Sequence, residues 1–436
     1  MSESGDNTIL VSNNGIYRAL PVYGSVHKGH VALVVGANGL TGTHMARVLG
    51  ASPGRWEKVY CLSRSHASAD FPSNVDFIQS DLLSGTEELG RTLKDLNVNI
   101  DYVFFFAYTQ PPPSNGGRLW SNVDEMVSSN GALLVNLLSA LDYANIKPRR
   151  FLLQTGGKNY GVHLGPTKTP QEEWFPRCDL EPNFYYFQED SLWDWCRKNA
   201  TEWVISMPSF VIGAVSHCQM SLALPLGIYA AVSAYLGEPL VFLGDISAWT
   251  TVQRNSSAML NAYFAEWLAL EEKTANEKFN STDGTIWTWE MMFPRIADWY
   301  GIKVEGPRPD DSPDYITVPA RDRLPPRGYK SSARPRFRSM TTSWAKQPKV
   351  QTAWNKLKVE HGLKNGAMDN IESTFAILDG AMIFPSSGVM STDKARKRGW
   401  NGYVDSYESL LETLDELAEL KLIPPVPKIT RTFFRF

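Results

Sequence analysis

The sequence that decides the fold reads Val31-Ala-Leu-Val-Val-Gly36-Ala37-Asn38-Gly39-Leu40-Thr41-Gly42, and a helix-like run follows it over 44–49. The apolar run before Gly36 has the composition of a strand that is buried on both faces. Glycines at 36, 39 and 42 let the backbone approach a pyrophosphate, whose charge the N-terminus of the following helix receives. The glycine pattern is weak evidence by itself, but its strand–turn–helix setting favours a dinucleotide site over a structural turn.

Similar apolar runs recur along the first half of the chain, and each is followed by a helix-like segment. Such alternation predicts βαβ units and a parallel sheet that is buried on both faces. The spacing favours an α/β fold of the Rossmann type, with a doubly wound parallel sheet. The apolar runs lie at 31–35, 59–62, 75–78, 102–106, 151–154 and 203–207.

The chain has 436 residues, more than the roughly 250–300 at which a single core stops growing, so we expect two lobes. Residues 1–28 are expected to form an N-terminal extension. Residues 29–210 should form the Rossmann domain, joined by later strands from about 238–285. Residues 211–436 should mainly form a smaller, mostly helical substrate-binding lobe. Its helices are expected at 287–300, 350–361, 369–378 and 406–420.

The composition is that of a globular protein, with 43% hydrophobic residues, 20% charged residues and a net charge of −3. This balance gives no reason to expect nucleic acid or an anionic membrane as a partner. The apolar segment 222–236 contains Pro225 and Gly227 and is too short to span a bilayer, so we expect no membrane insertion. The polar, acidic N-terminus predicts no signal peptide and therefore a cytoplasmic protein.

Two further expectations concern metals and assembly. The four cysteines and seven histidines do not show the spacing of metal ligands, so we expect no metal site. The sequence leaves the oligomeric state open, a homodimer included.

The end of the second apolar run, Leu62-Ser63-Arg64-Ser65, indicates which dinucleotide binds. An NAD site normally has Asp or Glu at this point, which accepts hydrogen bonds from the ribose hydroxyls. An arginine between two hydroxyls suits the adenosine 2′-phosphate, a dianion that a carboxylate would repel. We therefore expect NADPH/NADP+ as the cofactor, against the alternative that Arg64 is an ordinary solvated side chain.

Asp81 follows the third apolar run in the segment Ile78-Gln-Ser-Asp81-Leu82. It stands where such folds place an acceptor for the adenine amino group, although a residue that caps the end of the strand is an equal alternative. The expected cofactor-binding residues in these loops are Gly36, Asn38, Gly39, Leu40, Thr41, Gly42, Ser63, Arg64, Ser65, Asp81 and Leu82.

Most short-chain dehydrogenases carry a Tyr and a Lys one helical turn apart, in which the lysine lowers the pKa of the tyrosine, the general acid. The sequence has one literal match, Tyr143-Ala-Asn-Ile-Lys147. It comes before the fifth apolar run, whereas the usual pair comes after it. We therefore expect Tyr143 to have no catalytic role.

Two other motifs do follow the fifth run. They are Gln154-Thr155-Gly156-Gly157-Lys158-Asn159-Tyr160 and Asn183-Phe184-Tyr185-Tyr186-Phe187-Gln188-Glu189-Asp190. Together they resemble the plant progesterone 5β-reductase/iridoid synthase (PRISE-like) family of atypical short-chain dehydrogenases. Segments 62–64, 278–280, 353–363 and 393–402 also have family-like counterparts, so the resemblance covers nearly the whole chain after residue 28.

The resemblance implies an oxidoreductase in which Lys158 and Tyr185 are both catalytic and in contact with the cofactor. In that family NADPH delivers hydride to the β-carbon of an α,β-unsaturated carbonyl, and the tyrosine hydroxyl stabilises the developing enolate. The expected partner is a small, largely apolar carbonyl metabolite, as in secondary metabolism. Three alternatives stay open: an NADPH-dependent ketone reductase, a non-redox cyclase or isomerase that has kept the fold, and a nucleotide-sensing regulatory protein that needs the glycine loop but not the Lys158 and Tyr185 pair.

The sequence also departs from the family, mainly where the substrate should bind. Phe106-Ala107-Tyr108 stands where members often have tryptophan, and Thr374-Phe375-Ala376 where they often have Trp-Trp-Phe. Because ring volume is lost, steroid or iridoid substrates should not be carried over. We expect Tyr108, Phe210 and Phe375 to line the substrate pocket.

The proline-rich segment 310–349 is longer and more basic than is usual in the family. Its charges could bind an acidic group, but a solvated surface loop is the favoured interpretation. Its basic residues include Arg321, Arg323, Arg327, Lys330, Arg334, Arg336 and Arg338.

Overall fold

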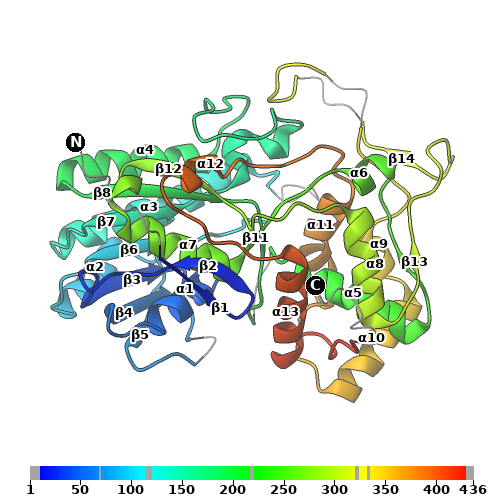
Figure 1. Cartoon of the computed structure of the whole chain (residues 1–436), viewed down its shortest axis with the longest axis horizontal. Helices are drawn as coiled ribbons and strands as arrows, with labels where there is room; N and C mark the ends of the chain where they lie inside the picture. The colour runs from blue at the N-terminus through cyan, green and yellow to red at the C-terminus, as the bar shows by residue number, and fades with distance from the viewer. Residues whose placement is uncertain are drawn as a thin grey trace, which may run out of the picture.

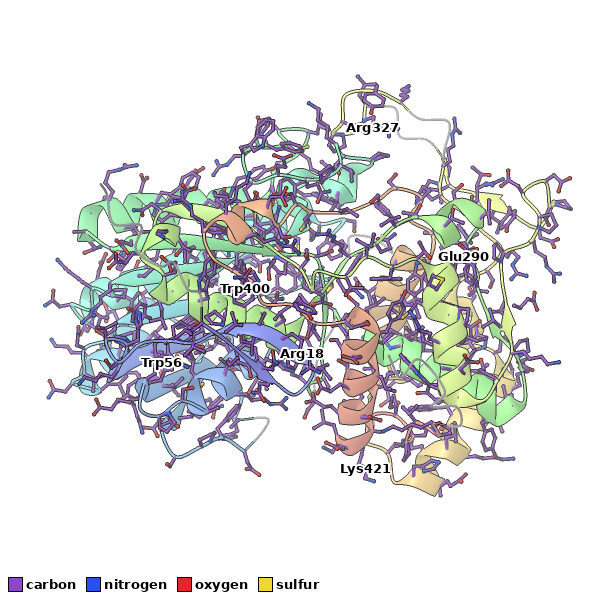
Figure 2. The ribbon with its side chains drawn as sticks, in the orientation of Figure 1. Arg18, Trp56, Glu290, Arg327, Trp400 and Lys421 are labelled. Carbon is purple, nitrogen blue, oxygen red and sulfur yellow. The ribbon has the colours of Figure 1, made fainter. Side chains whose placement is uncertain are left out.

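The structure is a computed structural model that describes residues 10–67, 70–112, 120–216, 220–319, 324–330, 334–364 and 366–428. Two lobes lie side by side (Figure 1). One contains a large sheet with helices on both faces, and the other is mainly helical. Figure 2 shows side chains filling both lobes, with Trp56 in the sheet lobe and Glu290 in the helical lobe.

The large sheet has seven strands in the order β12-β8-β7-β6-β3-β4-β5, and every neighbouring pair is parallel. This confirms the doubly wound α/β fold. The strand order reverses beside β3, so the crevice between β3 and β6 is the position where such sheets bind ligands. The strands are β3 (His30–Val35), β4 (Trp56–Ser63), β5 (Val75–Gln79), β6 (Tyr102–Phe105), β7 (Arg150–Gln154), β8 (Glu202–Pro208) and β12 (Glu277–Ser281).

Successive side chains of β3 enter two separate cores. Val34 packs in the core under α1 (Leu40–Gly50) and α7 (Ala258–Leu270), whereas Leu33 and Val35 pack in the core on the opposite face. That second face is covered by α2 (Thr86–Asp95), α3 (Val123–Tyr143) and α4 (Phe184–Asn199), which pack on one another in that order. The continuous apolar run in the sequence thus reflects a strand that is buried on both sides.

The helical lobe is built around α5 (Ala223–Leu236), whose residues are buried on nearly all sides. The apolar segment that contains α5 is therefore a core helix, and within the described ranges no helix is long and apolar enough to cross a membrane. The helices around α5 are α8 (Trp289–Tyr300), α9 (Thr341–Ala345), α10 (Pro348–His361), α11 (Ile371–Met382) and α13 (Ser406–Glu419). The helices expected at 287–300, 350–361 and 406–420 are confirmed as α8, α10 and α13, within two residues at each end, and the helix expected at 369–378 is α11, which extends four residues further.

Short elements complete the fold. Three small pairs of strands are β9 (Phe210–Ile212) with β11 (Asn255–Ser257), β10 (Leu240–Val241) with β13 (Val304–Glu305), and β14 (Ile316–Thr317) with β15 (Arg336–Phe337). The short helices are η2 (Gly157–Tyr160), η3 (Val162–Leu164), η4 (Glu272–Thr274), α6 (Ile246–Thr250) and α12 (Asp393–Lys397).

Part of the N-terminal extension is an ordered hairpin of β1 (Val11–Asn14) and β2 (Tyr17–Pro21). The backbone of Arg18 pairs with that of Tyr403, and the hydroxyl of Tyr17 donates to Glu412 Oε2 at 2.7 Å. The hairpin therefore contacts the C-terminal part of the chain, including α13 (Figure 1).

The basic segment 310–349 is only in part the expected solvated loop, because Lys330 and Arg334 are exposed but two other arginines are bound to the helical lobe. Arg336 Nε donates to the buried Asp245 at 2.8 Å, and Arg338 Nη1 donates to Glu305 at 3.1 Å. These two arginines hold the segment against the helical lobe because carboxylates of that lobe neutralise them. Arg321 and Arg323 lie outside the described residues.

Candidate active site

The glycine turn after β3 is shaped by contacts that only glycine permits. Gly36 has a φ of +85°, and a Cβ there would lie 2.7 Å from the backbone nitrogen of Ala107. A Cβ on Gly42 would collide with the Gly36 carbonyl, so α1 packs directly on the turn. The first turn of α1 has no acidic residue, and no side chain caps its N-terminus. These features fit a site for pyrophosphate.

The turn is anchored to the loop after β4. The backbone nitrogen of Gly36 donates to the Leu62 carbonyl at 2.9 Å, and Asn38 Nδ2 donates to Ser65 Oγ at 2.9 Å. Asn38 therefore joins the two loops that the sequence assigns to the cofactor. Arg64 lies on the same loop with an exposed side chain, and no carboxylate in the described part of the chain pairs with its guanidinium. Its position and charge fit a 2′-phosphate.

Asp81 forms hydrogen bonds within the turn that follows β5. Its Oδ1 accepts from the backbone nitrogen of Leu83 at 3.0 Å, and its carbonyl accepts from that of Ser84 at 3.1 Å. This geometry supports the capping alternative, while the contact with adenine stays a prediction. The adjacent Leu82 is buried, and its carbonyl accepts from Asn136 Nδ2 at 2.6 Å.

Lys158 and Tyr185 come from separate elements that the fold brings together. Lys158 lies in η2, directly after β7, and Tyr185 lies in the first turn of α4. Asn183 caps α4 by accepting from the Tyr185 backbone nitrogen at 3.0 Å, and its Nδ2 donates to the Lys158 carbonyl at 2.9 Å. One side chain therefore fixes both backbones.

This pair lies at the same edge of the sheet as the glycine turn. Gln154, the last residue of β7, donates from Nε2 to Thr41 Oγ1 at 3.1 Å, and Thr41 belongs to the first turn of α1. The structure thus brings the two groups of candidate residues to one place.

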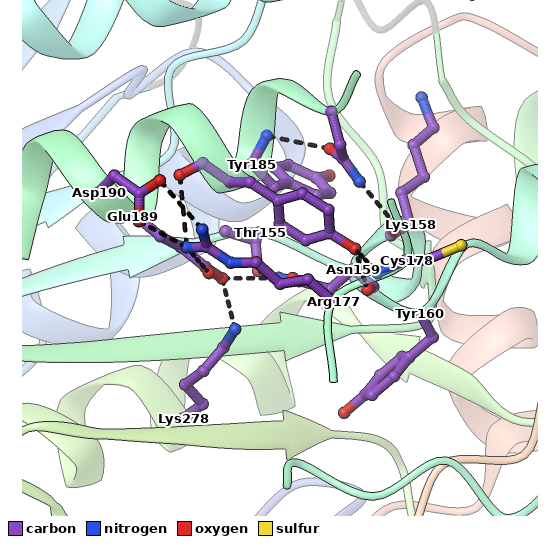
Figure 3. A network of polar contacts seen from close by, with 12 residues as sticks. Thr155, Lys158, Asn159, Tyr160, Arg177, Cys178, Tyr185, Glu189, Asp190 and Lys278 are labelled. Atoms are coloured by element: carbon purple, nitrogen blue, oxygen red, sulfur yellow. Dashed lines mark hydrogen bonds and ion pairs between the residues drawn. The ribbon is translucent and has the colours of Figure 1, made fainter. Parts of the chain in front are cut away.

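A buried carboxylate, that of Glu189, links the two motifs to each other and to other parts of the chain. Glu189 is fully buried and accepts from Asn159 Nδ2 at 2.9 Å. Its two oxygens also pair with Lys278 Nζ at 2.6 Å and Arg177 Nη2 at 2.9 Å (Figure 3). Two cations and an amide offset the cost of burying this charge. The network joins segments that are far apart in the sequence.

Tyr186 has a structural position, unlike its neighbour Tyr185. Its hydroxyl donates to the Asn159 carbonyl at 2.7 Å and accepts from the Cys178 backbone nitrogen at 2.8 Å. Residues of the first motif, 154–160, are therefore hydrogen-bonded to residues of the second motif, 183–190. The sequence alone gives no role to Asn183, Glu189, Arg177 or Lys278, although Asn183 and Glu189 lie within the motif N-F-Y-Y-x-x-E-D.

The ammonium group of Lys158 lies against an aromatic face. Its Nζ is 3.4 Å from the ring centroid of Trp120 and 5.8 Å from that of Phe184. Burial lowers the pKa of Lys158 well below its usual value, and the charge of Glu181 opposes this shift. Figure 3 shows the side chain extending away from the Glu189 network. Within the described residues no hydrogen bond joins Lys158 Nζ to the hydroxyl of Tyr185.

Trp120 is held over Lys158 by its own contacts. It has a φ of +68°, which is unusual for a bulky residue. Its Nε1 donates to the hydroxyl of Tyr108 at 2.8 Å, and that hydroxyl donates to Gln110 Oε1 at 2.5 Å. Trp120 therefore covers the lysine.

The hydroxyl of Tyr185 is available to a ligand. No group in the described ranges forms a hydrogen bond with it, and it would lie 3.3 Å from a Cβ added to Gly156. Burial raises the pKa of Tyr185, and the neighbouring Tyr108 raises it further. The phenol is thus protonated at neutral pH and can donate a hydrogen bond to a ligand oxygen.

Tyr143 lies elsewhere. It is the last residue of α3, is 46% exposed, and has its ring 5.8 Å from Lys94 Nζ on α2. Tyr143 precedes the start of β7, whereas Lys158 follows the end of that strand, so the two lie at opposite ends of β7. Among the described residues, no hydrogen bond or ring contact joins Tyr143 to the paired motifs.

The three residues expected in the substrate pocket have different environments. Tyr108 is 36% exposed, and its ring centroid is 6.0 Å from that of Phe184. Phe210 is exposed on β9. Phe375 is completely buried and packs against Trp344, 6.1 Å between centroids, in the core of the helical lobe. The structure thus gives Phe375 a core position, on the face of α11 that packs into the helical lobe.

The family model of the PRISE-like Rossmann-fold domain matches residues 32–324. The chain belongs to the PRISE-like family. This confirms the resemblance carried by the Lys158 and Tyr185 motifs and establishes a fold of the short-chain dehydrogenase/reductase type.

Two relatives and one solved structure are similar to this PRISE-like protein. The 3-oxo-Delta(4,5)-steroid 5-beta-reductase of Arabidopsis thaliana is 32% identical over 63% of this chain and 70% of its own. An (S)-8-oxocitronellyl enol synthase of Camptotheca acuminata is 25% identical over 90% of this chain and 93% of its own. The enzyme WbmG of Bordetella bronchiseptica, solved in complex with NAD, has a TM-score of 0.56 at 14% identity, over 93% of this chain and 98% of its own. This last similarity concerns the fold alone.

Proposed function

We propose that this protein is an NADPH-dependent reductase of an α,β-unsaturated carbonyl on a small, largely apolar metabolite. The observation that carries the proposal is the free hydroxyl of Tyr185, fixed beside Lys158 by Asn183 at the sheet edge where the glycine turn lies. A protonated phenol beside a dinucleotide turn is the arrangement that carbonyl reduction requires.

The residues present fit NADPH. The glycine turn and the start of α1 would hold the pyrophosphate, and the exposed Arg64 with Ser63 and Ser65 would hold the 2′-phosphate. When bound, NADPH supplies a hydride. We assign Lys158 to the nicotinamide ribose, which requires its ammonium to leave the face of Trp120.

The chain's own contribution is to stabilise charge on the substrate oxygen. As hydride reaches the β-carbon of the substrate, negative charge develops on its carbonyl oxygen. The Tyr185 hydroxyl donates a hydrogen bond to that oxygen and so stabilises the developing charge. Burial raises the pKa of Tyr185, so the phenol remains a donor across the neutral range. Protonation of the α-carbon then completes the reduction.

The names of two relatives support an enone as the substrate of this protein. One relative is named for reduction of a 3-oxo-Δ4,5 steroid, in which a carbonyl is conjugated with a double bond, and the other is named as an enol synthase. The change at Tyr108, whose ring lies 6.0 Å from that of Phe184, argues against the same substrates here. We assign the protein to secondary metabolism in the cytoplasm, with a small carbonyl compound as its partner and neither nucleic acid nor a membrane.

The test is a panel of enones and plain ketones, incubated with the protein and NADPH. NADPH consumption and product masses are read together. We expect an enone to consume NADPH and to yield a product two mass units heavier with its carbonyl retained. Reduction of plain ketones alone would support the ketone-reductase alternative. A product of unchanged mass without NADPH consumption would support the cyclase or isomerase alternative.

A further inference from the structure

A cavity of about 380 Å³ lies outside the residues described above. Its size is within the range of small-molecule sites. It lies between the loop around Thr169, the residue Arg254 just before β11, and the segment 389–396 that leads into α12. None of the expected cofactor residues lines it.

The cavity walls are held by hydrogen bonds of the protein itself. The backbone nitrogen of Gln171 donates to the Val389 carbonyl at 2.9 Å, and that of Ser391 donates back to the Gln171 carbonyl at 2.8 Å. Arg254 Nη1 donates to the Met390 carbonyl at 3.0 Å. These hydrogen bonds fix the position of the cavity walls.

The charge of the cavity is positive. Arg254 and Arg396 both line it, with Asp393 as the one carboxylate among its lining residues. Neither arginine forms an ion pair within the described part of the chain, and the buried Nε of Arg254 has no hydrogen-bond partner there. Burial lowers the pKa of Arg254, and the charge of Arg396 lowers it further, against the opposing effect of Asp393. An anion would relieve this repulsion.

The remaining wall supplies hydrogen-bond donors suited to oxygen atoms. Thr169, Ser391 and Thr392 line the same cavity. Thr169 Oγ1 already donates to the Ser387 carbonyl at 3.1 Å, whereas Ser391 Oγ accepts from the Asp393 backbone nitrogen at 3.2 Å and keeps its own proton to donate. Two guanidinium groups with hydroxyls around them form the donor set that recognises carboxylate and phosphate.

We propose that this cavity is an oxyanion site that binds the carboxylate or phosphate group of a small molecule. It is separate from the cofactor site but adjacent to the catalytic loop. A Cβ on Gly157, next to Lys158, would lie 3.1 Å from the methyl group of Met390, whose carbonyl holds Arg254. The anion is either a free oxyanion or the acidic group of a substrate.

The test is calorimetric titration of the full chain, saturated with NADP+, with inorganic phosphate and separately with acetate. We expect one site in the wild type and at least a tenfold loss of affinity in Arg396→Ala. Arg396 is exposed, so its replacement should leave the fold intact. Lys397→Ala is the matched control, because it removes the same charge from the next position of α12 without lining the cavity.

Retained affinity in Lys397→Ala together with the loss in Arg396→Ala supports the site. No binding of either anion by the wild type at tens of millimolar, or equal affinity in the two variants, overturns it.

The source of the anion is resolved by a second comparison, of an acidic enone with its methyl ester. If Arg396→Ala raises the KM of the acid but not that of the ester, the anion is the acidic group of a substrate. If both KM values are unchanged and the wild type binds phosphate, the anion is a free oxyanion.

Discussion

Asn183 donates a hydrogen bond from its side-chain amide to the backbone carbonyl of Lys158, at 2.9 Å. The oxygen of the same amide accepts from the backbone nitrogen of Tyr185 at 3.0 Å. The relative position of the two candidate catalytic residues therefore depends on one short side chain. An aspartate would be an equally good helix cap but could not donate to the Lys158 carbonyl.

Replacing Asn183 with aspartate separates its two functions. The carboxylate can still accept from the Tyr185 backbone and cap α4, but it cannot donate to the Lys158 carbonyl. We expect Asn183→Asp to keep thermal stability within about 1 kcal/mol while lowering turnover at least tenfold, because Lys158 is displaced. Asn183→Ala should lose both stability and turnover. Thermal unfolding and steady-state rates measure this, and full turnover in Asn183→Asp would show that the bond to Lys158 is not needed.

The two adjacent tyrosines should respond differently to loss of their hydroxyls. Tyr185→Phe removes the donor to the substrate oxygen, so turnover should fall by about 10²-fold or more while NADPH affinity changes little. Tyr186→Phe instead removes two bonds within the fold, to Asn159 and Cys178, and should mainly cost about 1–3 kcal/mol of stability. Rates and calorimetry on both variants test this. The reverse pattern would exchange their roles.

Cofactor choice should depend on Arg64. We expect NADPH to bind at least tenfold more tightly than NADH, a difference of about 1.4 kcal/mol, through contact with the 2′-phosphate. Arg64→Ala should erase most of this preference by weakening NADPH alone. Lys28→Ala is the control, because it removes an exposed charge just before the opposite end of β3. Equal affinities for both nucleotides in the wild type would refute the assignment.

Asp283 should make stability depend on pH. It is fully buried, accepts from Ser406 Oγ at 2.9 Å on α13, and also accepts from the backbone of Ser257 at the start of α7. Burial raises the pKa of Asp283 from its ordinary 3.8 to about 7. Between these pH values the folded state holds more protons than the unfolded state, so this contribution to stability is lost as pH rises towards 7.

The measurement is urea unfolding from pH 5 to pH 8, with Asp283→Asn as the control that stays uncharged. The stability of the wild type relative to that variant should fall by up to about 1.4 kcal/mol per pH unit below pH 7 and then level off. A difference that is constant over the range would contradict the raised pKa.

The parallel sheet could be predicted from the sequence because its strands are continuous apolar runs, and such runs follow from burial on both faces. The hairpin 11–21 could not be predicted in this way. Its β1 strand is exposed, and its position depends on Tyr403 and Glu412, which are hundreds of residues away.

The candidate site was predictable only in part. The glycine turn and Arg64 follow from local chemistry, whereas Lys158 and Tyr185 were identified through the family motifs. The ion pair of Lys278 with Glu189 joins residues from β12 and α4, so no local pattern indicates it. The position of Trp120 over Lys158 depends on a positive φ at a non-glycine residue, which composition does not encode.

The central claim is that Tyr185 assists hydride transfer to the β-carbon of an enone. The most direct test uses NADPH that carries deuterium at the transferable position of the nicotinamide, with the best enone of the panel, and locates the label in the product by NMR. We predict one deuterium at the β-carbon, with the carbonyl retained, at a rate that falls at least 10²-fold in Tyr185→Phe. Deuterium at a carbinol carbon, or a product without deuterium, would contradict the account.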